Sequence, residues 1–194
     1  MKAFIKVITL MLCAVMAIFA LTSCGKDEEV LEGDIYADIV IEDYGTITVK
    51  LDPEAAPITV ANFVKLAKDG FYEGLTFHRI MEGFMMQGGN GEPAGKKADS
   101  IKGEFSENGV ANPLSHTRGA ISMARTNVMD SASSQFFIVH ADSTFLDGKY
   151  AAFGYVTEGL DVVDEVCESS RPVDDNGTIL TAEQPVIDKI IIRE

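Results

Sequence analysis

The sequence predicts a mainly β protein, an antiparallel barrel or sandwich that also carries two α-helices. Several short runs of alternating or β-branched residues are separated by glycines, as in all-β proteins. Only two stretches show the apolar period of a helix, and they do not alternate with the strands as in a doubly wound sheet. The chain has 194 residues, of which 46% are hydrophobic, which suffices for one domain with a substantial core.

The predicted elements begin with a β-hairpin and a helix. Residues 35–41 alternate apolar and polar side chains, residues 43–45 interrupt the pattern, and residues 46–51 resume it. A helical pattern then begins at Pro57 and ends at Gly70. Proline in the first turn and glycine just past the last turn are the usual boundaries of a helix.

The rest of the chain predicts further short strands and a second helix. The expected strands are 76–80, 84–87, 119–124, 135–139, 151–156 and 186–192, and the expected helix is 160–167. The connection over residues 88–112 is longer than most loops of a compact domain, and loops of that length usually carry function or small structures of their own.

Residues 1–23 have the features of a signal peptide. Lys2 and Lys6 precede an apolar run over residues 8–21. As a helix this run would rise only about 21 Å, which is less than the ~30 Å of a hydrocarbon core. A cleaved signal peptide is therefore expected rather than a spanning helix.

The apolar run ends in Leu21-Thr22-Ser23-Cys24, which resembles the bacterial lipobox. In that motif the cysteine receives a lipid and becomes the first residue after cleavage. The resemblance implies lipidation at Cys24, an acidic tether over residues 24–33, and a folded domain over residues 34–194. The expected location is extracytoplasmic, at a bacterial membrane, with the lipid as the only membrane attachment.

The charge of the chain excludes some classes of partner. The net charge is −14, from 30 acidic and 16 basic residues. Nucleic-acid binding requires clustered Lys and Arg, so no nucleic-acid partner is expected. Nothing in the sequence suggests self-association, and we expect a monomer.

Residues that carry covalent or metal chemistry are scarce. His78, His116 and His140 do not have metal-ligand spacing, and each is expected to be a hydrogen-bonded strand or loop residue. Cys167 lies among helix-spaced apolar residues and is expected to be a small buried hydrophobe, so no disulfide is predicted within the domain. We expect no metal and no cofactor.

Three strand-like runs predict an outer face that combines apolar, amide and guanidinium groups. Residues i and i+2 of a strand face the same way, so Phe136 and Ile138 are assigned to the core and their neighbours to the outside. The pairs assigned to the outer face are Gln135 with Phe137, Phe77 with Arg79, and Met85 with Gln87. Such a face suggests a binding surface for an apolar group that carries amides. Ordinary sheet packing explains the same periodicity equally well.

Six segments, in this order, are similar to the cyclophilin family of peptidyl-prolyl cis/trans isomerases. They are Pro57-Ile58-Thr59-Val60-Ala61-Asn62-Phe63, Gly70-Phe71-Tyr72-Glu73-Gly74, Phe77-His78-Arg79, Phe84-Met85-Met86-Gln87-Gly88-Gly89, Ser134-Gln135-Phe136-Phe137-Ile138 and Leu146-Asp147-Gly148-Lys149. The resemblance runs from about Asp34 to the end of the chain. It implies a closed eight-stranded antiparallel barrel capped by two α-helices, with a substrate groove on the outside of the barrel.

The resemblance also implies site residues, with Arg79 as the catalytic arginine. The implied substrate-binding residues are Phe84, Met85, Phe137 and Leu146 around the proline ring, Gln87 and Gln135 at the substrate backbone, Ala124, Arg125 and Thr126 along the groove, and Phe145 and Tyr150 where animal members carry Trp and His. The implied partners are proline-containing polypeptides, and the implied activity needs no cofactor.

The expected function is rotation of X-Pro bonds in exported or unfolded polypeptides, with an arginine that stabilises the twisted amide. One alternative is a non-catalytic proline-peptide-binding module or holdase chaperone on the same fold. Another is a surface protein whose groove serves a dedicated partner. Arg79 discriminates between these functions, because a protein that only binds could lose it.

Overall fold

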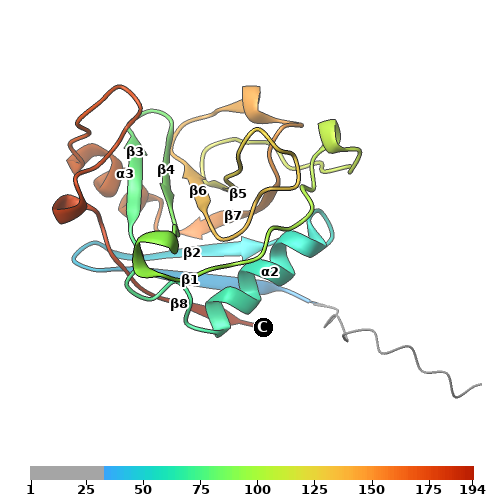
Figure 1. The fold of residues 1–194 in the computed structure, drawn as a ribbon, viewed down its shortest axis with the longest axis horizontal. Coiled ribbons are helices and arrows are strands. Elements are labelled where there is room, and N and C mark those ends of the chain that lie inside the picture. Colours follow the sequence, from blue (N-terminus) through green and yellow to red (C-terminus); the bar gives the residue numbers. More distant parts are fainter. Residues whose placement is uncertain (1–32) are drawn as a thin grey trace, which may run out of the picture. The chain divides into compact units, whose positions relative to one another are not determined.

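Across residues 33–194, the part of the chain that the structure describes, eight strands form one antiparallel sheet in the order β3-β4-β6-β5-β7-β2-β1-β8 (Figure 1). These coordinates are a computed structural model. The strands are β1 (Ile35–Ile41), β2 (Gly45–Leu51), β3 (Phe77–Met81), β4 (Met85–Gly88), β5 (Ala120–Met123), β6 (Phe136–Val139), β7 (Ala152–Glu158) and β8 (Ile187–Arg193). Every predicted strand is confirmed. The predicted signal peptide, the lipidation site Cys24 and nearly all of the tether lie outside the described residues.

Two α-helices pack against different strands of the curled sheet. Helix α2 (Pro57–Lys68) packs against β8, and helix α3 (Leu160–Ser169) packs against β2 and β4 (Figure 1). Within residues 33–194, no helix is long and apolar enough to cross a membrane. Cys167 of α3 is buried as predicted, and this burial raises the pKa of its thiol to about 12, so the thiol is unreactive at neutral pH.

Four short 3₁₀ helices lie in the connections. They are η1 (Glu92–Ala94), η2 (Ser106–Asn108), η3 (Thr144–Leu146) and η4 (Thr181–Glu183). The first two belong to the long connection before β5, so that loop carries small structures of its own, as its length predicted.

The sheet is open, and the predicted closed barrel is wrong. Strands β3 and β8 are the two ends of the sheet and share no ladder. They meet only where they begin, through an isolated bridge between Thr76 and Val186 and flanking backbone hydrogen bonds such as that from Ile187 N–H to the Leu75 carbonyl. The free edge of β3 is instead occupied by the chain that leads into β8. Ile80 N–H donates to the Gly177 carbonyl at 2.8 Å, and Ile179 N–H donates to the His78 carbonyl at 3.0 Å. Because this segment takes the backbone groups of β3, the last ladder of a barrel cannot form.

The inner face of the sheet encloses the main core. Phe63 of α2 is fully buried, and its ring centroid lies 5.2–5.5 Å from the rings of Tyr72, Phe136 and Phe153. The Tyr72 hydroxyl donates to the Ser134 carbonyl at 3.0 Å, so its polar end is satisfied inside the core. This packing holds β6 and β7 in place beneath the outer face.

A second apolar cluster lies on the outer face. It contains the buried residues Met85, Ala120, Phe137, Val139 and Leu146. Phe136 and Ile138 belong to the main core instead, so the predicted alternation along β6 is confirmed. The outer side chains are covered rather than bare, since only 5% of Phe137 is exposed.

The predicted pairing of Phe77 with Arg79 on one face is wrong. Phe77 is fully buried in the main core, whereas Arg79 is partly exposed. The register between β3 and β4 shifts between these two residues. A bulge of this kind breaks the two-residue period, so Arg79 reaches the outer face while Phe77 and Ile80 both point inward.

Helix α2 is capped by a residue from the long connection. Ala56 precedes the helix and offers no side-chain cap. The Glu104 carboxylate accepts hydrogen bonds from Ile58 N–H at 3.0 Å, from Thr59 N–H at 2.7 Å and from the Thr59 hydroxyl at 2.7 Å. This satisfies N–H groups that a helix otherwise leaves unpaired.

Candidate active site

Arg79 is fixed at the edge strand β3 by contacts at both ends of its guanidinium. Its Nε donates to the Asn176 carbonyl at 2.7 Å, and its Nη1 donates to Gln87 Oε1 at 3.3 Å. The thioether sulfur of Met81 lies 3.3 Å from Nη2, and that of Met85 lies 3.8 Å from Nη1. A guanidinium carries five N–H donors, and two of these meet only the weak thioether acceptors, so the group can still donate to a further ligand.

The environment of Arg79 weakens its hydration but keeps it charged. Partial burial lowers the pKa of Arg79 from its ordinary value, and the charges of Tyr150 and Asp174 oppose that shift. An arginine stays protonated at any physiological pH even so. A cation held away from bulk water interacts more strongly with a nearby acceptor.

Two amides lie beside the guanidinium. Gln87 of β4 donates through Nε2 to Oε1 of Gln135 at 2.9 Å, while its own Oε1 accepts from Arg79. Strand β4 pairs with β6 in a register that sets Gln87 opposite Phe137. The predicted residues Arg79, Gln87 and Gln135 therefore form one hydrogen-bonded chain across three segments.

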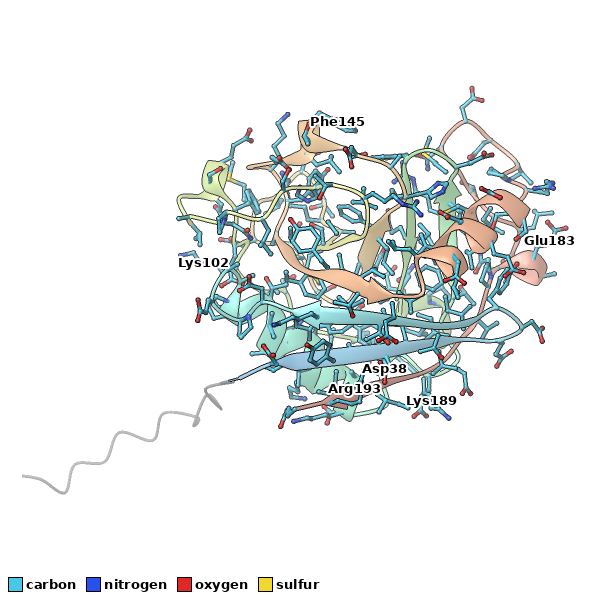
Figure 2. The ribbon with its side chains drawn as sticks, turned by 180° about the vertical axis from the view of Figure 1, so that it is seen from behind. Asp38, Lys102, Phe145, Glu183, Lys189 and Arg193 are labelled. Carbon is cyan, nitrogen blue, oxygen red and sulfur yellow. The ribbon has the colours of Figure 1, made fainter. Side chains whose placement is uncertain are left out.

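The apolar side of the site is the outer cluster. Met85, Phe137 and Leu146 are its buried members among the predicted residues, and Phe84, Ala124 and Tyr150 pack against it. The Arg79 guanidinium lies 5.9 Å from the centroid of the Phe84 ring. On η3, Phe145 has its ring centroid 5.7 Å from that of Phe84. Phe145 is 63% exposed, so an apolar ligand could cover it. Figure 2 shows Phe145 at the opposite margin from Asp38 and Arg193.

Arg125, Thr126 and Tyr150 form the far side of the site. The Arg125 guanidinium lies 4.8 Å from the Tyr150 ring centroid and 4.9 Å from that of Phe105. Its Nε donates to the Lys149 carbonyl and its Nη1 to the Thr126 carbonyl. Thr126 itself bonds to Ser131 through its N–H and hydroxyl, so it joins the other predicted residues only through Arg125.

A buried histidine supports the apolar cluster, and its role was not predicted. His116 is fully buried, its Nδ1 lies 2.8 Å from Asp147 Oδ1, and its Nε2 lies 3.0 Å from the Ser122 hydroxyl. Its ring stacks on Phe137 with a centroid separation of 5.9 Å. Asp147 belongs to the Leu146-Asp147-Gly148-Lys149 motif. The presence of a carboxylate in this motif, with His116 upstream of it, was the sequence feature that could have indicated the pair.

The other two histidines differ from each other. His140 Nδ1 accepts from Gly83 N–H at 2.9 Å and its Nε2 lies 3.1 Å from Asp164, so it is a hydrogen-bonded residue as expected. His78 lies in β3, where its carbonyl accepts from Ile179 N–H, but its Nδ1 atom has no hydrogen-bond partner. No group of three His, Cys, Asp or Glu residues within residues 33–194 could hold a metal ion.

A cavity of about 440 Å³ lies beside Gln135. It is lined by the loop over residues 90–98 and by Ser133, Ser134 and Gln135. The cavity therefore adjoins the amide end of the site rather than Arg79. The long connection that predicted functional importance provides most of its wall.

A fixed cation, two linked amides and an outer apolar cluster suit a ligand that combines backbone amide groups with an apolar side chain or ring. The sequence profile of the family described as cyclophilin type peptidyl-prolyl cis-trans isomerase/CLD matches residues 36–192. The chain belongs to this family, and it is a peptidyl-prolyl cis-trans isomerase.

Similar sequences carry the same name. The chain is 48% identical over 124 residues to peptidyl-prolyl cis-trans isomerase B of Bacillus subtilis, which covers 63% of this chain and 83% of that protein. It is 41% identical over 131 residues to peptidyl-prolyl cis-trans isomerase B of Escherichia coli. That match covers 63% of this chain and 79% of the Escherichia coli protein.

Solved structures share the fold. A cyclophilin type isomerase of Cryptosporidium parvum superposes with a TM-score of 0.72 at 25% identity, covering 84% of this chain and 99% of that one. The same protein, solved in the presence of the dipeptide Ala-Pro, gives a TM-score of 0.70.

Proposed function

We propose that Arg79 is the catalytic residue of this isomerase and that it acts by stabilising the twisted X-Pro amide. The observation that carries the proposal is the fixed Arg79 guanidinium, held at Nε and Nη1 beside the apolar cluster. An X-Pro bond resists rotation by about 18–20 kcal/mol because of amide resonance. When the bond twists, the prolyl nitrogen regains a lone pair that can accept a hydrogen bond from the guanidinium.

This hydrogen bond favours the twisted state over both planar states, and such preference is what lowers a barrier. A hydrogen bond to a charged group contributes about 1.5–3 kcal/mol. A 10⁵-fold acceleration requires about 7 kcal/mol. Arg79 therefore supplies part of the stabilisation, and the remainder comes from holding the peptide on either side of the rotating bond.

The proposed holding residues divide by chemistry. Phe84, Met85, Phe137 and Leu146 hold the proline ring, with Phe145 and Tyr150 at its border. Gln87 and Gln135 bind the substrate backbone, and Ala124, Arg125 and Thr126 line the path of the preceding residues. The solved relative in the presence of Ala-Pro supports proline-containing polypeptides as the partners.

We further propose that the substrates are exported or unfolded polypeptides and that the enzyme is an extracytoplasmic, lipid-anchored monomer. The lipobox-like Leu21-Thr22-Ser23-Cys24 and the apolar run before it support this location. Replacing Cys24 with alanine is expected to release the full-length protein from membranes during fractionation. A variant that stays in the membrane fraction contradicts lipid anchoring at Cys24.

The catalytic role is tested with the full-length Arg79→Ala variant and an X-Pro peptide, by NMR exchange spectroscopy or a coupled assay. We expect kcat/KM to fall by about 10- to 100-fold, the loss of one charge-assisted hydrogen bond. Arg171→Ala is the matched control, because Arg171 is an exposed arginine that bonds only backbone carbonyls at the end of α3. Equal rates in Arg79→Ala and wild type contradict the proposal.

A further inference from the structure

The turn over residues 174–178 lies against Arg79, and it was predicted only as a turn. The side chains of Asp174, Asp175, Asn176 and Thr178 are all exposed. The backbone of the turn nevertheless faces inward and delivers two consecutive carbonyls to β3. The Asn176 carbonyl accepts from Arg79 Nε at 2.7 Å, and the Gly177 carbonyl accepts from Ile80 N–H at 2.8 Å.

The turn is fixed from within by the Asp174 carboxylate. Its Oδ1 accepts from Asn176 N–H at 3.1 Å and from Thr178 N–H at 2.9 Å, and the Asp174 carbonyl accepts from Gly177 N–H at 3.1 Å. The hydrogen bonds to the carboxylate, that from Thr178 first, lower the pKa of Asp174. The carboxylate is therefore charged and accepting at neutral pH, as in an Asx-turn.

Close approach of the turn to β3 requires a glycine at position 177. Gly177 has φ +85, a left-handed conformation, and a Cβ there would lie 2.5 Å from Met81 Cγ and 2.7 Å from the Ile80 carbonyl oxygen. A larger residue would push the turn away from the strand. The distance between the Asn176 carbonyl and Arg79 depends on this contact.

We propose that the 174–178 turn is a positioning device for Arg79, in which the Asp174 carboxylate fixes the turn and the Asn176 carbonyl holds the Nε end of the guanidinium. With Nε occupied and Nη1 held by Gln87, rotation about the end of the side chain is restricted, and the guanidinium stays beside the apolar cluster. Asp174 and Asn176 are positioning residues, because they act through Arg79. This inference rests on the proposed catalytic role of Arg79.

The test compares three variants of the full-length protein. Asp174→Ala removes the acceptor that fixes the turn, and we expect kcat to fall about threefold to tenfold with KM unchanged, since small misplacement of a catalytic group is costly. Asp174→Asn retains an acceptor oxygen, and we expect it to restore kcat. Asp175→Ala removes the neighbouring exposed carboxylate, which makes none of these hydrogen bonds, and we expect wild-type kcat from it.

A second measurement reports the position of Arg79 directly. In ¹⁵N NMR spectra, the Nε–H of Arg79 is expected to exchange slowly with water in the wild type, because it is hydrogen-bonded, and several times faster in Asp174→Ala. Asp174→Asn should retain slow exchange. The backbone amide signals in the same spectra show whether each variant is folded.

The outcomes separate this inference from the proposed function. If Asp174→Ala keeps both the wild-type kcat and slow Nε–H exchange, the positioning role is overturned whatever Arg79→Ala does. If kcat of Asp174→Asn is as low as that of Asp174→Ala, the charge of Asp174 acts on Arg79 directly, and the turn mechanism is also overturned. If Arg79→Ala retains the wild-type rate, the catalytic role fails, while Nε–H exchange still reports whether the turn holds the side chain.

Discussion

His116 connects the apolar cluster to the chain beyond η3 through one buried ring. A carboxylate only accepts hydrogen bonds, so Nδ1 donates to Asp147, and in the neutral form that burial favours Nε2 accepts from the Ser122 hydroxyl. The ring is then neutral and in one tautomer. Burial lowers the pKa of His116, although its bonds to Asp147 oppose the shift.

This neutral ring predicts a pH-dependent stability. An unfolded histidine has a pKa of about 6.5, so below that pH the unfolded chain binds a proton that folded His116 does not. The contribution of neutral His116 to the free energy of unfolding is therefore complete above about pH 6.5. It is lost as the pH falls towards the lower pKa that His116 has in the folded state. We expect the free energy of unfolding, measured with urea, to decrease between pH 7 and pH 5, values that bracket the unfolded pKa of about 6.5.

A His116→Gln variant provides the control. It should be less stable at pH 7 and show a shallower decrease with acid. Some decrease will remain, because burial also lowers the pKa of His78. A wild-type free energy that does not change over this range contradicts a neutral buried His116.

At the same scale, strand periodicity predicted some side-chain positions and missed others. It placed Met85, Gln87 and Phe137 on one face because each lies in a strand with an unbroken two-residue period. It misplaced Phe77 because a bulge is set by the partner strand, whose register the sequence does not state. Asn176 was missed because its contact with Arg79 spans 97 residues and uses a backbone carbonyl, which leaves no side-chain signature.

Among the elements, α2 shows how a predicted helix can depend on an unpredicted partner. Pro57 and Gly70 mark its boundaries in the sequence, but its cap comes from Glu104, 45 residues after Thr59. Glu104 is only 2% exposed, and its carboxylate is paired entirely with groups of the first turn. The long connection therefore stabilises α2 as well as forming the cavity wall.

The cap gives a second prediction. Glu104→Ala leaves two buried N–H groups and a hydroxyl without acceptors, and we expect the free energy of unfolding to fall by about 2–4 kcal/mol. For a domain of this size such a loss lowers Tm by several degrees, which calorimetry measures. Glu104→Gln retains one acceptor oxygen and should lose less. Equal losses in the two variants would show that charge, rather than the hydrogen bonds, carries the effect.

For the whole molecule, the sheet joins the two ends of the described chain. β1 pairs with β2 on one side and with β8 on the other, in a register that sets Tyr36 opposite Arg193. The Arg193 guanidinium bonds Asp38 through Nε at 2.7 Å and Nη2 at 2.8 Å (Figure 2). The last strand thus completes the layer that β1 begins, and the open edge of the sheet lies beyond it.

Loss of this strand is expected to prevent folding. A chain that ends at Val186 lacks the buried Ile187 and Ile190 and leaves one side of β1 unpaired. We expect circular dichroism and amide NMR of this truncated protein to show no cooperative fold. Deletion of Glu194 alone removes an exposed ion pair to Lys68 and is expected to change Tm by only about 1 °C or less. A cooperative melting transition in the longer truncation contradicts this role of β8.

The open sheet also marks the limit of what the sequence predicted at this scale. The alternating runs specify the eight strands, and the resemblance supplied only their closure into a barrel. Closure depends on whether the chain between α3 and β8 leaves the edge of β3 free, and that segment carries no strand pattern. The antiparallel class was therefore predictable, whereas the open edge was not.

Because Tyr36 and Arg193 are paired, the position of the carboxyl end decides where a fusion partner or a support can be attached to the enzyme. The carboxyl end of the chain emerges next to the first strand, and Figure 2 places Phe145 at the far margin from it. A fusion partner, an affinity tag or a solid support joined there would leave the margin that carries Phe145 unobstructed. An immobilised enzyme coupled through its last residue should then accept long unfolded clients as readily as short peptides.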